Sequence, residues 1–341
     1  MNDQGYLKLI KLYLEILRNE KVLKSLSRLN HFYDEPQFYL YQAVLGFYRK
    51  YSDGFFPQNK YILAAGLSSS SKYFALFKCL CEAMERYCLY SYKKGGILYD
   101  KFTNISNGAL DPKTYSLNSG FDTHIVGWVK GNYFINHDEC YVPAQLVYLN
   151  YIRKKGEHIL TKNIISTGAA GGQDRESALL RGAYEVLERD AFMTIYLNKI
   201  SPPLINIEKL RSQKILKIIN YYKRYKLDVY LFQITTDLSI PTFLTILINR
   251  TAHPPFLSLG LKCSLNIECA IIGCLEEAFL TRQWIRKGFL EGTLNPKIKA
   301  KDINDTYGRA AFWTKKDRLH KIDFLIHQKH KELNYSQFTY K

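Results

Sequence analysis

One five-residue pattern occurs twice in this chain, as E-A-M-E-R at residues 82–86 and as E-V-L-E-R at residues 185–189. On a helix, this spacing puts both carboxylates and the arginine of each copy on one face. Neighbouring carboxylates repel each other, and a single arginine does not neutralise both. Two such faces brought together form a carboxylate-rich pocket, which in proteins typically holds a hard cation such as Mg²⁺ with a polyphosphate.

Alone, either copy is typical of a solvated helix face with one weak Glu–Arg pair. Each copy, however, follows a turn of small residues, at residues 64–71 (A-A-G-L-S-S-S-S) and 166–173 (S-T-G-A-A-G-G-Q). Glycine lets the backbone approach an anion closely, a helix N-terminus presents free amides to it, and serine hydroxyls cap helices. The repeated order of turn, helix and acidic face therefore favours a functional site.

Composition leaves the partner open between two interpretations. The chain has 341 residues, 47% of them hydrophobic, and a net charge of +17. This charge favours an acidic partner such as a nucleotide, a nucleic acid, an anionic membrane or an acidic peptide, and it is equally typical of a generic basic surface. The 27 tyrosines and 19 phenylalanines raise nucleic-acid binding as a hypothesis. Because no nucleic-acid-binding pattern is present, we expect no nucleic-acid partner.

The cysteines and the N-terminus predict the compartment. Seven cysteines form neither a C-x-x-C pair nor a zinc-ribbon spacing, which suits the reducing cytoplasm. Residues 6–17 are apolar, but Lys8, Lys11 and Glu15 interrupt them at helical spacing. The segment therefore predicts an amphipathic helix, and we expect neither a signal peptide nor a membrane partner.

The hydrophobic patterns predict alternating strands and long helices. Helices are expected at residues 5–28, within 31–50, and at 72–92, 175–198, 215–224, 267–286 and parts of 313–331. Strands are expected at 61–65, 123–129, 139–148, 159–165, 229–234, 242–248 and 256–261, with a hairpin at 132–138.

Strand, small-residue turn and long helix follow one another three times, around Gly66, Gly168 and Gly260. This coarse repeat predicts an α/β fold (an α+β sandwich) in which the sheet is flanked by long helices. We expect one domain over residues 1–341. Its predicted parts are a helical extension (1–58), a motif-bearing core (about 60–286) and a charged C-terminal region (288–341).

Taken together, three segments resemble the YcaO superfamily. In the first, Ala75 precedes the first E-x-x-E-R by seven residues. The second, residues 166–189, resembles the family pattern S-x-G-x-A-x-G-N-x-x-x-E-A followed by a helix with E-x-x-E-R. The third resembles the family's last helix at Gly260, Ala270, Glu277 and Arg282. The resemblance extends over residues 60–286 and implies the family's ATP-binding fold.

Four features depart from the family pattern. The lysine usual in the first turn is replaced near Ser68, and the asparagine of the second turn is Gln173. The glutamate before the alanine is Ser177, although Glu176 stands beside it. The C-terminus lacks the proline-rich ending of many azoline-forming members, and we expect no leader-binding domain in this chain.

The resemblance implies ATP- and Mg²⁺-dependent phosphorylation of a peptide backbone amide oxygen, after which a nucleophile replaces that oxygen. By resemblance, Mg²⁺ ligation falls to Glu82, Glu85, Glu185 and Glu188. Catalytic contacts to phosphate fall to Arg189 and Arg282. Nucleotide binding falls to Ser68, Gln173, Glu176, Ser177, Arg189 and Arg282. Arg86 has either a binding role or a purely structural one.

A neighbouring Cys, Ser or Thr side chain gives an azoline, sulfide gives a thioamide, and an amine gives an amidine. The resemblance also implies a precursor peptide as substrate, a separate leader-binding or sulfur-delivery partner, and a homodimer. The departures at Ser68 and Ser177 leave a second hypothesis open: a scaffold that has lost catalysis and binds a peptide or partner enzyme.

Overall fold

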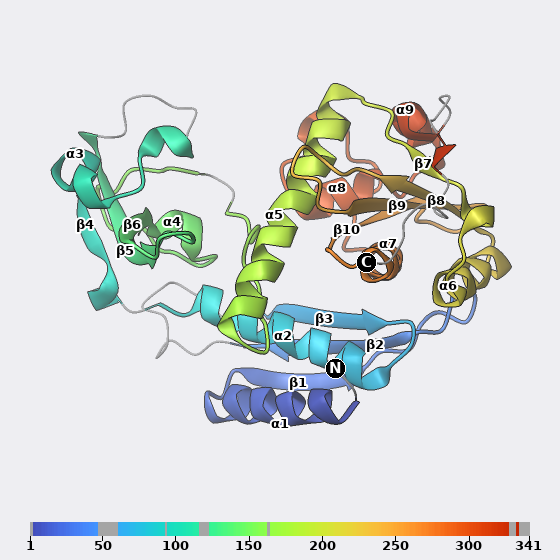
Figure 1. Ribbon diagram of the computed structural model, residues 1–341, viewed down its shortest axis with the longest axis horizontal. Helices are drawn as coiled ribbons and strands as arrows, with labels where there is room; N and C mark the ends of the chain where they lie inside the picture. Colours follow the sequence, from blue (N-terminus) through green and yellow to red (C-terminus); the bar gives the residue numbers. More distant parts are fainter. Residues whose placement is uncertain are drawn as a thin grey trace. The chain divides into compact units, whose positions relative to one another are not determined.

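The computed structural model describes residues 3–46, 61–92, 94–115, 123–161, 164–326 and 332–333. The chain divides into two compact units, and each unit is assembled from separate stretches of sequence (Figure 1). The first unit contains residues 1–27, 41–66 and 76–171, and the second contains residues 28–40, 67–75 and 172–341. Strands β1, β2 and β3 and helix α2 each have residues in both units.

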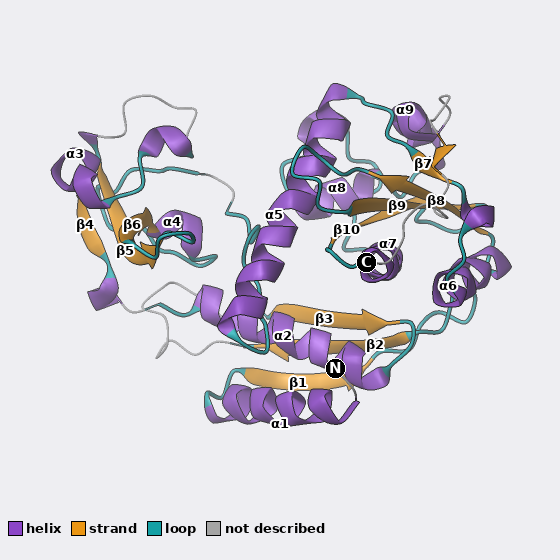
Figure 2. Cartoon of the chain, in the orientation of Figure 1, coloured by secondary structure: helices purple, strands orange, loops and turns teal. Residues whose placement is uncertain are grey.

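Among the described residues, the elements that begin before residue 172 are α1 (Asp3–Asn19), β1 (Leu23–Arg28), β2 (Tyr39–Leu45), β3 (Ile62–Ser68), α2 (Lys72–Tyr90), β4 (Leu98–Lys101), α3 (Phe102–Ile105), β5 (Ile125–Asn132), β6 (Glu139–Pro143) and α4 (Ala144–Val147). The later elements are α5 (Arg175–Asn198), β7 (Leu204–Ile205), α6 (Gln213–Arg224), β8 (Leu227–Gln233), β9 (Thr242–Asn249), β10 (Leu257–Cys263), α7 (Ile267–Leu290), α8 (Thr306–Phe312), α9 (Asp323–Ile326) and β11 (Glu332–Leu333). Figure 2 distinguishes the helices from the strands.

The described strands form three sheets, in the orders β1-β2-β3, β4-β5-β6 and β10-β9-β8-β7-β11. The third sheet lies in the second unit, and all of its pairs are antiparallel except β7 with β11. Every residue of β9 is buried, because both faces of this strand are covered. On one face, Leu244 and Ile246 join a core cluster with Ala191 and Ile195 of α5.

On the opposite face of β9, Thr245 Oγ1 lies 3.0 Å from Cys274 Sγ of α7. Helix α6 packs beside α7, and the Tyr222 hydroxyl donates to the carbonyl of Leu275 at 2.8 Å. Figure 1 accordingly shows α7 below this sheet in the view and α9 above it. The sheet therefore holds α5 and α7 on opposite faces and fixes the side chains that these helices present.

The first unit contains a buried polar centre at Glu157. Its carboxylate accepts hydrogen bonds from the Gly127 and Lys154 amides, the Gln145 side chain and the Tyr151 hydroxyl, at 2.9–3.0 Å. The bond from Tyr151 to Glu157 and burial both raise the pKa of the phenol, burial being the larger cause. These bonds tie the loop after α4 to strand β5.

The expected fold class is confirmed: helices flank the sheets of a mixed α/β structure. Helix α5 has the expected bounds, 175–198, and helices 72–92, 215–224 and 267–286 appear as α2, α6 and α7. The strands expected at 61–65, 123–129, 229–234, 242–248 and 256–261 appear as β3, β5, β8, β9 and β10. The hairpin at 132–138 joins β5 to β6.

The N-terminal expectation is wrong in part, because residues 1–58 are not a helical extension. The helix predicted over 5–28 ends at Asn19, two residues before Lys21, whose φ of 56° is incompatible with a right-handed helix. The helix predicted within 31–50 is strand β2, since Y-L-Y-Q-A-V-L fits a half-buried strand. Residues 47–60 lie outside the described residues.

Two further strand predictions are corrected. The strand expected over 139–148 ends at Pro143, and the short helix α4 begins at the next residue. Of the strand expected over 159–165, the described residues 159–161 and 164–165 belong to no strand. The Leu160 amide donates to the Gln145 side chain, 3.1 Å away, and so makes no ladder bond.

All seven cysteines are free thiols, and five of them are buried. Burial, and secondarily the charge of Glu82, raise the pKa of Cys79 to about 12, so its thiol stays protonated. Within the described part of the chain, none of the helices has the length and apolar character needed to cross a membrane.

Candidate functional site

The serine turn before α2 is held by internal hydrogen bonds. Ser68 is fully buried, and its hydroxyl oxygen accepts from the amides of Ser70 and Ser71 at 3.3 Å. The amide and hydroxyl of Ser69 donate to Glu276 of α7 at 2.6 and 2.8 Å. Ser71 caps α2 by accepting from the amide of Phe74 at 3.2 Å. Ser68, predicted to bind nucleotide, therefore shapes this turn.

Helix α2 carries the first acidic face, in the first unit. Glu82 accepts from the Ala65 amide at 2.9 Å and from Arg86 at 3.1 Å. Arg86 also lies 3.6 Å from Glu85, so one guanidinium serves both carboxylates. Although burial opposes its charged form, Glu82 and Glu85 raise the pKa of Arg86 above its ordinary value. The structural role considered for Arg86 is observed.

The glycine-rich turn before α5 is closed by a capping box. Asp174 accepts from the Ser177 amide at 2.7 Å, and the Asp174 amide donates to the Ser177 hydroxyl at 3.2 Å. A Cβ on Gly172 would lie 2.6 Å from the backbone nitrogen of Ala178, so only glycine fits there. Ser177, a departure from the family pattern, thus fixes the helix start, while Gln173 and Glu176 are exposed beside it.

Helix α5 carries the second acidic face, in the second unit. Glu185 pairs with Arg189 at 3.0 Å, and the guanidinium remains 54% exposed. Glu188 is only 5% exposed. Its Oε1 accepts from the Cys263 amide at 2.7 Å and from Lys262 Nζ at 2.8 Å. A cation from strand β10 therefore lies directly against this face.

Glu277 of α7 belongs to the same cluster. The Leu261 amide donates to its carboxylate at 3.2 Å. Desolvation and the charge of Glu188 raise the pKa of Glu277 from 4.5 to about 7, and Lys262 opposes that rise. Because Glu277 keeps more than a third of its surface exposed, water screens part of this effect. The carboxylates of Glu185, Glu188 and Glu277 lie near two cations, Lys262 and Arg189, so negative charge is in excess when all three carboxylates are ionised.

Arg282 of α7 is buried and paired. Its Nε and Nη2 donate to Glu35 at 2.7–3.0 Å, and its Nη1 donates to the carbonyl of Pro255 at 2.7 Å. Arg286 also binds Glu35 and, at 2.8 Å, Asp34. The two arginines and two carboxylates form a network inside the second unit. Arg282 is therefore held rigidly, in contrast to the exposed Arg189.

The donor set fits a hard divalent cation in type, because carboxylate oxygens are the ligands Mg²⁺ uses. No group of three or more His, Cys, Asp or Glu side chains that could hold a metal ion occurs in the described part of the chain. Each acidic face supplies two glutamates at E-x-x-E spacing, fewer than a closed protein cage needs. Mg²⁺ commonly keeps waters and phosphate oxygens as its other ligands, so an incomplete protein set is compatible with it.

The sequence did not predict three residues that bind the candidate site residues or the serine turn: Glu35, Lys262 and Glu276. Glu35 is 247 positions from its partner Arg282, and no local pattern signals such a pair. Lys262 follows Gly260 by two residues, a position that the third strand–helix repeat brings near α5. The only sequence signal for Glu276 is its place beside Glu277.

The chain resembles known proteins over most of its length. Residues 69–338 match a family described as "YcaO cyclodehydratase, ATP-ad Mg2+-binding". An uncharacterized protein of Methanothermobacter thermautotrophicus is 25% identical over 191 residues, which are 55% of this chain and 50% of that protein. The chain thus spans about half the length of this relative.

Two solved structures share the fold. A heterocyclase in complex with substrate and cofactor matches 94% of this chain and 45% of its own, with a TM-score of 0.70 and 17% identity. YcaO from Methanopyrus kandleri, bound with AMPPCP and Mg²⁺, matches 99% of this chain and 78% of its own, with a TM-score of 0.70 and 14% identity. Since the family match covers far more than half of the sequence, the chain belongs to the YcaO family.

Proposed function

We propose that this protein uses ATP and Mg²⁺ to phosphorylate a backbone amide oxygen of a ribosomally made peptide, which leads to an azoline ring. The observation that carries this proposal is the cluster on α5, β10 and α7. There Glu188 is almost fully buried, Glu277 has a raised pKa, and the excess negative charge calls for a further cation. Membership of an ATP- and Mg²⁺-binding family supports the same conclusion.

In this proposal Glu82, Glu85, Glu185 and Glu188 hold Mg²⁺, which would neutralise charge on the transferring phosphoryl group. Arg189 contacts phosphate, because its guanidinium is the more exposed of the two candidate arginines. Arg282 is also assigned to phosphate. It would donate an N–H that is not already donated to Glu35 or to the carbonyl of Pro255. Gln173 and Glu176 bind nucleotide beside the helix start, and Ser68 and Ser177 act by holding the two turns.

A Cys, Ser or Thr side chain loses its S–H or O–H proton to solvent and adds to the amide carbon, and the amide oxygen accepts the γ-phosphoryl group of ATP, leaving ADP. The C–O bond then breaks, phosphate leaves with the amide oxygen, and a proton leaves the amide nitrogen to give the azoline. Phosphorylation is needed because an unmodified amide oxygen is a poor leaving group. Sulfide or an amine as nucleophile gives a thioamide or an amidine by the same steps.

We propose a precursor peptide as the substrate and a separate partner that binds its leader or delivers sulfur. The heterocyclase with a similar fold was solved with substrate and cofactor, which supports a role in modifying a substrate. A homodimer and a cytoplasmic location complete the proposal, and no nucleic-acid or membrane partner is part of it.

The first test is calorimetric binding of a non-hydrolysable ATP analogue with Mg²⁺. We expect binding by the wild type and its loss in Glu82→Gln/Glu188→Gln. Glu208→Gln, an exposed glutamate outside both acidic faces, is the matched control. Equal affinity in the wild type and the double variant would refute the assigned ligands.

A second test identifies the product by mass spectrometry of candidate precursor peptides incubated with ATP. Loss of one water per modified residue indicates an azoline, and exchange of oxygen for sulfur indicates a thioamide. No modification by a protein that binds nucleotide, whatever partner is supplied, would contradict the enzymatic proposal.

One observation favours a second candidate, a scaffold that has lost catalysis. Lys262 already supplies a cation to Glu188, the place where the enzymatic proposal needs Mg²⁺. A scaffold would bind a peptide or partner enzyme without requiring nucleotide. Measurable Mg²⁺–ATP affinity that disappears in Glu185→Ala would exclude this candidate.

A further inference from the structure

The second unit contains a cavity of about 420 Å³ that the proposed chemistry does not use. Its walls come from three segments: the second half of α5, residues 200–203, and residues 233–237. All three belong to the same unit, so the cavity is complete within it. The volume falls in the range of ligand-binding pockets in proteins.

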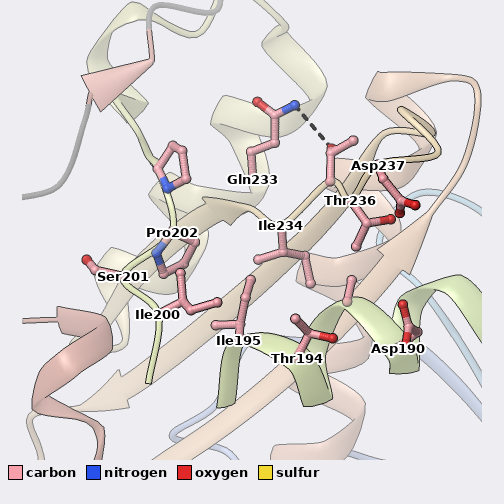
Figure 3. A pocket seen from close by; sticks show the side chains of 13 residues that line it. Asp190, Thr194, Ile195, Ile200, Ser201, Pro202, Gln233, Ile234, Thr236 and Asp237 are labelled. Atoms are coloured by element: carbon pink, nitrogen blue, oxygen red, sulfur yellow. Dashed lines mark hydrogen bonds between the residues drawn. The ribbon is translucent and has the colours of Figure 1, made fainter. Parts of the chain in front are cut away.

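The cavity has an acidic end and an apolar end. Figure 3 shows Asp190 and Asp237 at one end, Ile200 and Pro202 together with Ser201 at the other, and Ile195 and Ile234 between them. The threonine hydroxyls that line the wall add neutral hydrogen-bonding groups, and Gln233 donates to one of them, Thr235, at 3.1 Å. The site is therefore amphipathic along its length.

The two carboxylates stand out because the protein as a whole is strongly basic. The net charge of the chain is +17, yet no lysine or arginine is among the residues that line this cavity. Asp190 and Asp237 are both exposed, and neither carboxylate has an ion-pair partner in the described part of the chain. A cation entering here would find two anions that are not already neutralised.

The same features argue against a phosphate-bearing ligand. Two carboxylates repel an anion, and the Pro202–Pro203 wall has no backbone N–H groups to donate to one. The nucleotide assigned above therefore does not belong in this cavity. An aliphatic chain ending in a cation matches both ends, since lysine and arginine bury their stems against apolar surface and keep the charged head at a polar end.

Resting on the proposed peptide-modifying function, we propose that this cavity is a specificity pocket for a lysine or arginine side chain of the peptide substrate. Asp190 follows Arg189 directly in α5. A basic residue held here is thus anchored on the helix that carries Glu185 and Glu188. The protein would select peptides with a basic residue close to the modified position.

The test compares two short capped peptides that differ in one residue, Ac-Gly-Ile-Lys-Gly-NH₂ and its norleucine analogue. Binding to the full-length protein is measured by calorimetry at low and high salt. We expect the lysine peptide to bind on the order of tenfold more tightly at low salt, because two exposed ion pairs each contribute modestly. Equal affinity of the two peptides would overturn the proposal, and so would cadaverine binding as tightly as the lysine peptide.

Two variants test whether Asp190 and Asp237 cause the preference for the lysine peptide. Asp190→Asn/Asp237→Asn should abolish the preference for lysine, whereas Asp302→Asn removes one carboxylate outside the cavity and should leave it intact. Among the described residues, neither aspartate of the double variant makes a hydrogen bond or ion pair through its carboxylate, so folding should be retained, as circular dichroism would verify. An unchanged preference in the double variant would overturn the assignment.

Mg²⁺–ATP binding is measured on the same samples, which separates this inference from the proposed function. Intact nucleotide binding without any lysine preference overturns the pocket alone. A lysine preference without nucleotide binding supports the pocket and contradicts the enzymatic proposal.

Discussion

Nζ of Lys262 lies 2.8 Å from Oε1 of Glu188, so a cation on strand β10 partly neutralises the acidic face of helix α5. Burial opposes the charge of this lysine, but Glu188, Glu277 and Glu185 together raise its pKa above the ordinary value. The arrangement makes the cluster sensitive to any change in positive charge.

Lys262→Met should therefore lower the free energy of unfolding by about 1–3 kcal/mol, because it leaves a nearly buried carboxylate without its partner. Added Mg²⁺ should recover much of this loss by binding the folded state. Thermal unfolding with and without Mg²⁺ measures both effects. Lys130→Met, which removes an exposed pair with Glu139, is the control and should change little. A loss that Mg²⁺ does not reduce would contradict this account.

Glu35→Gln should destabilise the second unit strongly. The substitution removes a buried charge shared by Arg282 and Arg286, and breaking a buried pair typically costs about 3–5 kcal/mol. Urea unfolding measures the change. Asp228→Asn breaks an exposed pair with Arg250 and should cost less than about 1 kcal/mol. If the two variants lost similar amounts of free energy of unfolding, burial would not explain the stability that the Glu35 network contributes.

Gly172→Ala should weaken the turn that begins α5. Its Cβ would meet the backbone nitrogen of Ala178 at 2.6 Å, and overpacking of this kind costs about 1–3 kcal/mol. We also expect weaker binding of the ATP analogue, measured by calorimetry. Gly95→Ala is the matched control, because nothing lies within 4 Å of its added Cβ. Wild-type stability in Gly172→Ala would contradict the steric argument.

His158 should titrate below the ordinary value of 6.5, because burial and the nearby His124 both lower its pKa. A lowered pKa means that protonation favours the unfolded state, so the stabilising contribution is present above pH 6.5 and is lost as the pH falls below it. NMR titration of the imidazole measures the pKa, which should rise in His124→Gln. A pKa of His158 unaffected by that substitution would exclude the charge of His124 as a cause.

The sequence predicted those parts of the fold whose signals are local. Helix α5 has its expected bounds because Asp174 and Ser177 close a capping box and two prolines follow its end. Strand β9 was predictable from its run of apolar and β-branched residues. Strand β2 was not, because aromatic residues such as Tyr39 suit both a helix and a strand, and pairing with neighbouring strands decides between them.

In the candidate site, too, the sequence predicted only the contacts between residues that are close together along the chain. The spacing E-x-x-E-R predicts that Glu185 and Arg189 pair one turn apart, and the structure has them at 3.0 Å. The partners supplied by distant segments were beyond local reasoning, above all Lys262 for Glu188 and Glu35 for Arg282. Asp190 and Asp237 showed no special signal in sequence, and only the fold brings them to one cavity.

The interleaving of the two units along the chain constrains how the protein can be synthesised and dissected. The second unit takes residues 28–40 and 67–75 from within the stretch that otherwise builds the first. During translation these two segments are made early, and they cannot form their contacts within the second unit until the ribosome has made the rest of that unit. Glu35, for example, emerges 247 residues before Arg282. A single cut of the polypeptide near residue 171 would therefore leave only the second unit incomplete, because residues 28–40 and 67–75 stay with the N-terminal product, which keeps every residue of the first unit. A fragment of the second unit that folds alone would need these two segments rejoined to residues 172–341 by a new connection.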